Sequence, residues 1–111
     1  MSEQYEVVLS GDANNDLDGI YDYIAQNESR GRADHVIERI LDIIRSLSSP
    51  PERGSRPTEL RDAGAPDYRQ VHFKPYRIIY RVVEDRVRVY LIADPLRNMQ
   101  ALLQRRLLSG R

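Results

Sequence analysis

Four arginines in the second half of the chain could recognise an anion: Arg69, Arg77, Arg81 and Arg97. A guanidinium group is planar and permanently charged, and its N–H groups suit two-point contact with a phosphate or a carboxylate. Arginine is a poor proton shuttle because its pKa lies above about 12. A cluster of arginines therefore predicts binding and charge stabilisation, without a general base or a general acid.

The spacing of these arginines predicts where they lie on a sheet. In the stretch 76–83, YRIIYRVV, every second residue from the first tyrosine onward is apolar or aromatic, so that face should pack under helices. Arg77 and Arg81 then lie on the opposite, exposed and concave face, with Arg69 nearby and Arg97 at its rim. Single arginines can also serve only to keep a sheet soluble and to pair with carboxylates. Four like charges on one face favour a basin for an anion or an acidic peptide.

Other reactive side chains are scarce. The chain has no cysteine, which excludes disulfides and thiol nucleophiles. Its two histidines, His35 and His72, lack the paired spacing of a zinc site, so we expect neither a metal nor another cofactor. Strand alternation turns His72 away from Arg69, which favours a structural or surface role. His35 is predicted to lie on a helix surface.

The elements that must position these residues follow from periodicity. Residues 5–9 read as a strand, 12–27 and 33–47 as amphipathic helices, 50–66 as a proline- and glycine-rich loop, and 98–108 as a last helix. Residues 68–73, 76–83 and 87–92 read as three strands of an antiparallel meander. The predicted fold is a single α+β domain, 1–111, in the order β-α-α-β-β-β-α. Its N-terminal helical hairpin packs on an antiparallel sheet.

Charge is distributed unevenly along the chain. Residues 1–50 carry 4 basic and 10 acidic side chains, and residues 51–111 carry 13 basic and 7 acidic ones. The basic half could meet an anionic partner, or the two halves could neutralise each other once packed. The amino terminus lacks the features of an export signal, and no apolar run approaches the roughly 18 to 20 residues of a membrane span. We therefore expect a cytoplasmic protein without membrane contact.

The last predicted helix carries leucines on more than one side, including Leu102, Leu103, Leu107 and Leu108. This is more apolar surface than a small sheet readily covers. The leucines could seal the core, or they could form a docking surface for a partner. Homodimerisation could use the same surface.

The meander carries a resemblance to a known family. The stretch YRQVHFKPYRIIYRVVEDRVRVYLIADPLRNMQ, and above all YRIIYRV with the following V-x-V-Y-L-I strand and a later arginine, resembles the RelE/ParE toxins of bacterial type II toxin-antitoxin systems. The resemblance covers nearly the whole chain. It implies the RelE/ParE fold, a toxin role in plasmid stabilisation, and an antitoxin whose flexible acidic and amphipathic segment folds on the toxin. Leu102, Leu103 and Leu107 are the antitoxin contacts we expect.

Two targets divide this family, since RelE-like members cut messenger RNA in the ribosome and ParE-like members inhibit DNA gyrase without being nucleases. RelE-like sites use two strand lysines, two arginines and a tyrosine. Laid onto this chain, the lysines fall at Arg69 and Val71, the arginines at Arg77 and Arg97, and the tyrosine near Leu103.

Two of the carried-over positions are apolar, and losing proton transfer costs about 10² to 10⁴ in rate. We therefore favour a gyrase inhibitor that is not an enzyme and binds its target through Arg69, Arg77, Arg81 and Arg97. The alternatives are a messenger RNA endoribonuclease that uses Arg69, Arg77 and Arg97, and a non-toxic module that binds an antitoxin or a nucleic acid.

Overall fold

The fold is given by a computed structural model that describes residues 4–60, 66–94 and 99–108. Its main elements are β1 (Glu6–Leu9), α1 (Gly11–Asn27), α2 (Arg30–Arg45), β2 (Tyr68–Phe73), β3 (Tyr76–Val83), β4 (Arg86–Ala93) and α3 (Met99–Leu103). Three short 3₁₀ turns, Ser46–Ser48, Pro51–Arg53 and Thr58–Leu60, lie between α2 and β2, and a π-helical turn, Gln104–Leu108, follows α3. The predicted α+β order is confirmed. No helix of the described segments is long and apolar enough to cross a bilayer.

The two long helices form the predicted hairpin, and a serine starts each of them. The Ser10 hydroxyl accepts a hydrogen bond from the Ala13 N–H at 3.0 Å, and the Ser29 hydroxyl accepts one from the Arg32 N–H at 3.0 Å. Such caps satisfy N–H groups that have no partner inside the helix. With Ser29 as its N-cap, α2 begins at Arg30, three residues earlier than the periodicity predicts.

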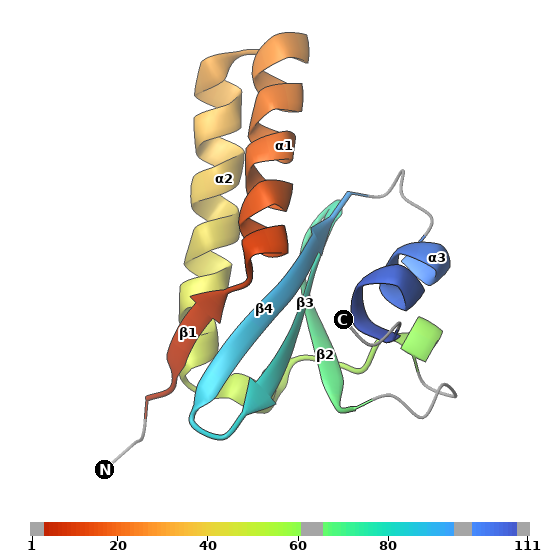
Figure 1. The fold of residues 1–111 in the computed structure, drawn as a ribbon. Coiled ribbons are helices and arrows are strands. Elements are labelled where there is room, and N and C mark those ends of the chain that lie inside the picture. Colours follow the sequence, from red (N-terminus) through yellow and green to blue (C-terminus); the bar gives the residue numbers. More distant parts are fainter. Residues whose placement is uncertain (1–3, 61–65, 95–98, 109–111) are drawn as a thin grey trace.

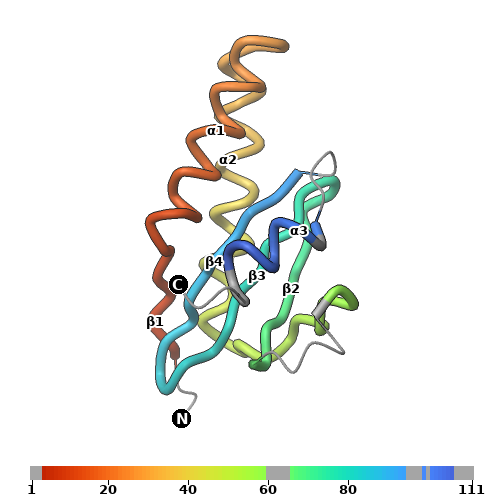
Figure 2. Tube along the Cα trace, turned by 45° about the vertical axis from the view of Figure 1, so that its right-hand side comes forward, coloured from red at the N-terminus to blue at the C-terminus, as the bar shows by residue number. Residues whose placement is uncertain are grey.

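The sheet has the strand order β1-β4-β3-β2. Strands β2, β3 and β4 form the predicted antiparallel meander, and β1 pairs parallel with β4, which makes the sheet mixed. The hairpin lies on one side of this sheet and α3 on the other, so the molecule has three layers (Figure 1). The tube view shows β1 beside β4, at the edge remote from β2 (Figure 2).

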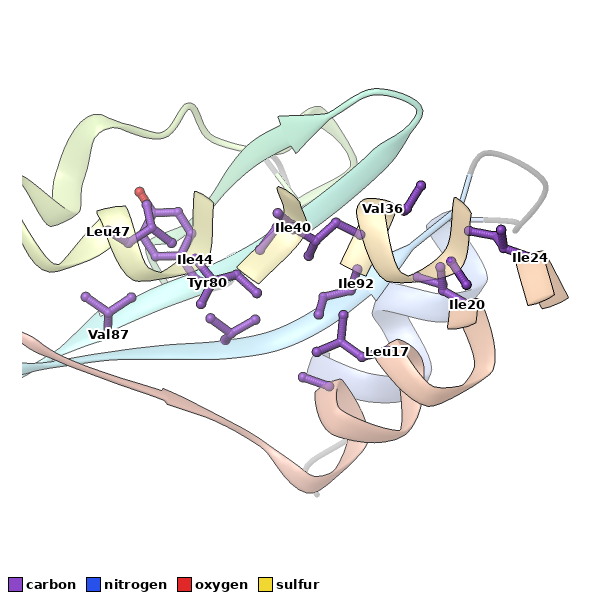
Figure 3. Packing of buried hydrophobic residues seen from close by; sticks show 14 residues of the cluster. Leu17, Ile20, Ile24, Val36, Ile40, Ile44, Leu47, Tyr80, Val87 and Ile92 are labelled. Atoms are coloured by element: carbon purple, nitrogen blue, oxygen red, sulfur yellow. The ribbon is translucent and has the colours of Figure 1, made fainter. Parts of the chain in front are cut away.

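An apolar cluster packs against each face of the sheet. Between the hairpin and the sheet, buried side chains from both helices meet the face of β3 that was predicted to pack inward (Figure 3). On the other face, Tyr68, Ile79, Leu91 and Ala93 pack against Leu102 and Leu103 of α3. The second cluster corrects the expectation that this face is an open concave surface. It is partly covered because α3 uses its leucines to close it.

The edge of β4 continues beyond the end of β1, and side chains take over its hydrogen bonds there. The Ile92 N–H donates to Asp16 Oδ2 at 2.9 Å, and the Tyr90 carbonyl accepts from Arg106 Nη1 at 3.1 Å. Tyr90 is also the extra residue of a β-bulge in β4. Two consecutive residues of β3 pair with Leu91 and Val89, which leaves Tyr90 without a partner in β3. Asp16 of α1 and the segment after α3 are therefore joined at one irregular point of the sheet.

Candidate target-binding face

The face of the sheet turned toward α3, called here the α3-side face, carries two of the predicted arginines. Arg77 lies directly opposite His72 in the β2–β3 register, and Arg81 lies directly opposite Tyr68. Directly paired residues of neighbouring strands project from the same face. Arg77 and Arg81 are thus on one face as predicted, and each is only partly exposed.

Arg77 is held by two side chains. Its Nη1 and Nη2 donate to the two carboxylate oxygens of Glu59 at 2.8 and 2.9 Å, and its Nε and Nη2 donate to Gln70 Oε1 at 3.0 and 2.6 Å. The hydrogen bond from Arg77 holds the pKa of Glu59 below its usual value, against the opposing effect of burial. The charge of Arg77 is therefore already balanced within the chain.

Arg81 has an aromatic neighbour. Its guanidinium carbon lies 6.0 Å from the centre of the Tyr68 ring, at the outer limit of a cation–π contact. The Tyr68 ring meets Tyr90 edge-to-face, with centroids 5.6 Å apart and planes at 81°. Burial raises the pKa of the Tyr68 phenol above its ordinary value of 10.0, so this phenol stays protonated near neutral pH and cannot act as a base.

The prediction that Arg69 lies near Arg77 and Arg81 is wrong. Arg69 is directly opposite Tyr80, which projects toward the helical hairpin, so Arg69 lies on the other face. Its Nη1 donates to the carbonyls of Glu52 and Gly54 at 2.8 and 3.0 Å. Strand alternation fixes the two faces within one strand, but the offset between two strands depends on the turn that joins them. The four-arginine basin is therefore not formed by the described residues.

The sequence also led to predicted positions for the two histidines and for Arg97. His72 points away from Arg69 as predicted, yet it shares the face of Arg77, because the basin was assigned to the wrong side of β2. His35 is exposed on α2, as predicted. In the described part of the chain, no three acidic or histidine side chains are grouped as metal ligands. Arg97 lies outside the described residues.

The leucines of the last helix were expected to contact an antitoxin. Leu102 is 3% exposed and Leu103 is fully buried, and both belong to the cluster between α3 and the sheet. In this conformation the two leucines therefore seal the core, which was the alternative to a docking surface. The side chain of Leu107 lies outside the described residues. An antitoxin contact through Leu102 or Leu103 would require α3 to leave the sheet.

The family model described as ParE toxin of type II toxin-antitoxin system, parDE, matches residues 7–98. The chain belongs to the ParE toxin family. A solved structure described as a chromosomal ParDE toxin-antitoxin system from P. aeruginosa is similar, with a TM-score of 0.70 and 20% identity. That match covers 84% of this chain and 98% of the other, and it shows a shared fold. No curated protein matches the sequence significantly.

Family membership confirms the resemblance drawn from the meander and makes this ParE-family toxin one half of a toxin-antitoxin pair.

Sequence reasoning missed one residue of the α3-side face. Arg88 of β4 lies directly opposite Arg81 of β3. The signal was present, because the two-residue turn Glu84–Asp85 makes residues 83 and 86 partners and so fixes the pairs that follow.

Proposed function

We propose that this ParE-family toxin inhibits DNA gyrase when it is free of its antitoxin, and that it acts in the cytoplasm as the growth-inhibiting half of a plasmid-stabilisation module. The family match over residues 7–98 supports the toxin class. The choice of target rests on the arrangement of the arginines, because the competing activity is cleavage of messenger RNA.

The observation that carries the proposal is the separation of Arg69 and Arg77. Cleavage of RNA through its own 2′-hydroxyl needs cations that converge on one phosphate, together with a base and an acid. Arg69 points to the hairpin side of the sheet and binds two carbonyls, whereas Arg77 points to the α3 side and binds Glu59. These two side chains cannot contact a common phosphate in this conformation.

The apolar positions argue in the same direction. Val71, where a nuclease of this superfamily carries its second lysine, packs against the hairpin-side core. Leu103 of α3, near the position of the tyrosine, is buried between α3 and the sheet. Neither side chain can relay a proton. The remaining contact surface proposed for the target is the α3-side face, with Arg77 and Arg81 as its basic residues.

Expression in a bacterial host without an antitoxin tests the proposal. We expect growth to stop and plasmid DNA to become relaxed. Purified toxin added to purified gyrase should then inhibit ATP-dependent supercoiling of a relaxed plasmid. Co-expression with the small acidic protein encoded beside the toxin should restore growth, and this pair should increase retention of an unstable plasmid.

Three outcomes would contradict the proposal in different ways. Arrest with intact supercoiling and messenger RNA cut at ribosomes would assign the chain to the ribonucleases. Arrest with neither change would point to another target. Normal growth at a protein level confirmed by immunoblotting would leave only the role of a non-toxic binding module.

A further inference from the structure

Two arginines lie side by side on the α3-side face, near the turn that joins β3 to β4. Arg81 of β3 is the direct register partner of Arg88 of β4, and this arginine pair continues a row that includes Val8 in β1 and Tyr68 in β2. Side chains in such positions have Cβ atoms about 4.5 to 5.5 Å apart. Like charges placed directly opposite each other destabilise a sheet. Arg81 is partly exposed and Arg88 is exposed.

The arginine pair lacks the carboxylates that other arginines have. Arg39, Arg77 and Arg106 all bind acidic side chains. The adjacent carboxylate, Glu6, binds Arg86 at 3.1 Å. Over residues 4–60, 66–94 and 99–108, neither Arg81 nor Arg88 has an acidic partner. Within the described residues, the charges of Arg81 and Arg88 are therefore not neutralised by an ion pair.

The aromatic neighbour prepares Arg81 for contact. Tyr68 lies beneath the guanidinium and is itself nearly buried, with 6% of its surface exposed. A guanidinium that lies over a ring face without donating hydrogen bonds to it keeps its N–H groups free to donate to a carboxylate in two-point geometry. Arg88 supplies a second guanidinium group from the neighbouring strand.

We propose that Arg81 and Arg88 together bind an acidic side chain presented by a partner protein. Carboxylate chemistry is favoured over nucleic acid for two reasons. A nucleic-acid surface needs a track of free cations, yet Arg77 and Arg106 are already neutralised by Glu59 and Asp16. Single strands also use exposed aromatic rings for base stacking, and Tyr68 is too buried to stack on a base.

The site can be tested with purified toxin and a defined probe. The probe is an eight-residue peptide of alternating glutamate and serine, added at low salt while the arginine Nε–Hε signals are followed by NMR. We expect the signals of Arg81 and Arg88 to move together and to saturate. The same peptide with glutamine for glutamate should leave them in place.

Paired variants separate the site from net charge. Arg81→Gln/Arg88→Gln should weaken binding of the acidic peptide at least tenfold. Arg39→Gln/Arg45→Gln loses the same charge from α2, where both arginines bind Asp42, and should bind within twofold of the parent. Circular dichroism and thermal melting verify the fold of each variant. Because repulsion is relieved, Arg88→Gln alone should melt no lower than the parent.

Two results would overturn the inference. Equal peptide binding by the two double variants would show that the arginine pair is no site. Tighter binding of a ten-nucleotide single-stranded DNA, lost in Arg81→Gln/Arg88→Gln, would assign the pair to phosphates instead. The peptide measurement does not involve gyrase, so its failure and a failure of the proposed target are distinguishable.

Discussion

Asp16 and Arg106 form an ion pair across 90 positions of the chain, with Arg106 Nη2 donating to Asp16 Oδ1 at 2.7 Å. The Asp16 side chain is 6% exposed, and that of Arg106 is 18% exposed. Asp16 also accepts from the Ile92 N–H, and Arg106 also donates to the Tyr90 carbonyl. This ion pair fastens the segment after α3 to α1 and to the edge of β4.

Replacing Asp16 should weaken the whole fold. Asp16→Asn removes the negative charge from a nearly buried pair and leaves Arg106 without its main counter-charge. We expect a loss of about 3 kcal/mol in the free energy of unfolding, the lower end for a buried pair because Arg106 keeps some access to water. Urea unfolding at neutral pH measures it. Asp18→Asn, an exposed position on the same helix, should change stability by less than about 0.5 kcal/mol. Equal effects would contradict the role given to the ion pair.

The buried hydroxyl of Tyr80 should anchor the loop after α2. It donates to the Pro51 carbonyl at 2.6 Å and accepts from the Gly54 N–H at 3.0 Å. Tyr80→Phe leaves both backbone groups without this partner and should cost about 1 to 3 kcal/mol. Hydrogen exchange at the Gly54 amide should accelerate more than exchange in α1. Tyr23→Phe is the control, since Tyr23 is 62% exposed.

Gly54 has no room for a side chain. A Cβ at this position would lie 2.6 Å from the Gln70 carbonyl oxygen and 2.7 Å from the Tyr80 hydroxyl oxygen. Gly54→Ala must therefore displace the loop from β2, and we expect a lower melting temperature. Gly19→Ala offers a contrast, because nothing lies within 4 Å of its Cβ and alanine favours a helix interior by about 1 kcal/mol. Opposite signs for the two variants are the expected result.

Stability should fall at low pH partly through Glu59. Its pKa is lowered in the folded state, chiefly by the hydrogen bond from Arg77, so its contribution is present above the unfolded value near 4.5. That contribution is lost as the pH falls through the lowered pKa. The difference in unfolding free energy between the parent and Glu59→Gln should therefore shrink from pH 7 to pH 3. A constant difference over this range would exclude the linkage.

Toxicity can be separated from the stability of the Arg77–Glu59 pair. Arg77→Gln removes the cation and Glu59→Gln keeps it, yet both break the bidentate contact. If Arg77 contacts the target, Arg77→Gln should lose growth inhibition while Glu59→Gln retains it at matched protein levels. Colony counts after induction measure both. Equal toxicity of the two variants would remove Arg77 from the proposed target contact.

Patterns within single elements predicted the fold well. The 3.6-residue period identified both long helices, whose buried residues include Leu17, Ile20, Val36 and Ile40. The alternation in β3 identified the face under the hairpin. These patterns work because each one reports the burial of a single element.

Relations between elements were harder to predict. The position of Arg69 could have been read from the two-residue turn between β2 and β3, which makes residues 69 and 80 partners. The ion pair of Arg77 could not, because it depends on Glu59, which lies in a proline-rich loop without periodicity. The parallel pairing of β1 depends on which strand edge remains free after the meander has formed. Long-range geometry of this kind leaves no period in the sequence.

The parallel pairing of β1 with β4 also affects when the sheet can be completed during synthesis of the chain. Glu6 has its register partner in Arg86, so β1 cannot pair with β4 until a segment 80 positions later has been synthesised. Contacts this distant form slowly, because a long loop must close before they are rewarded. During translation the nascent toxin therefore carries an unpaired leading strand.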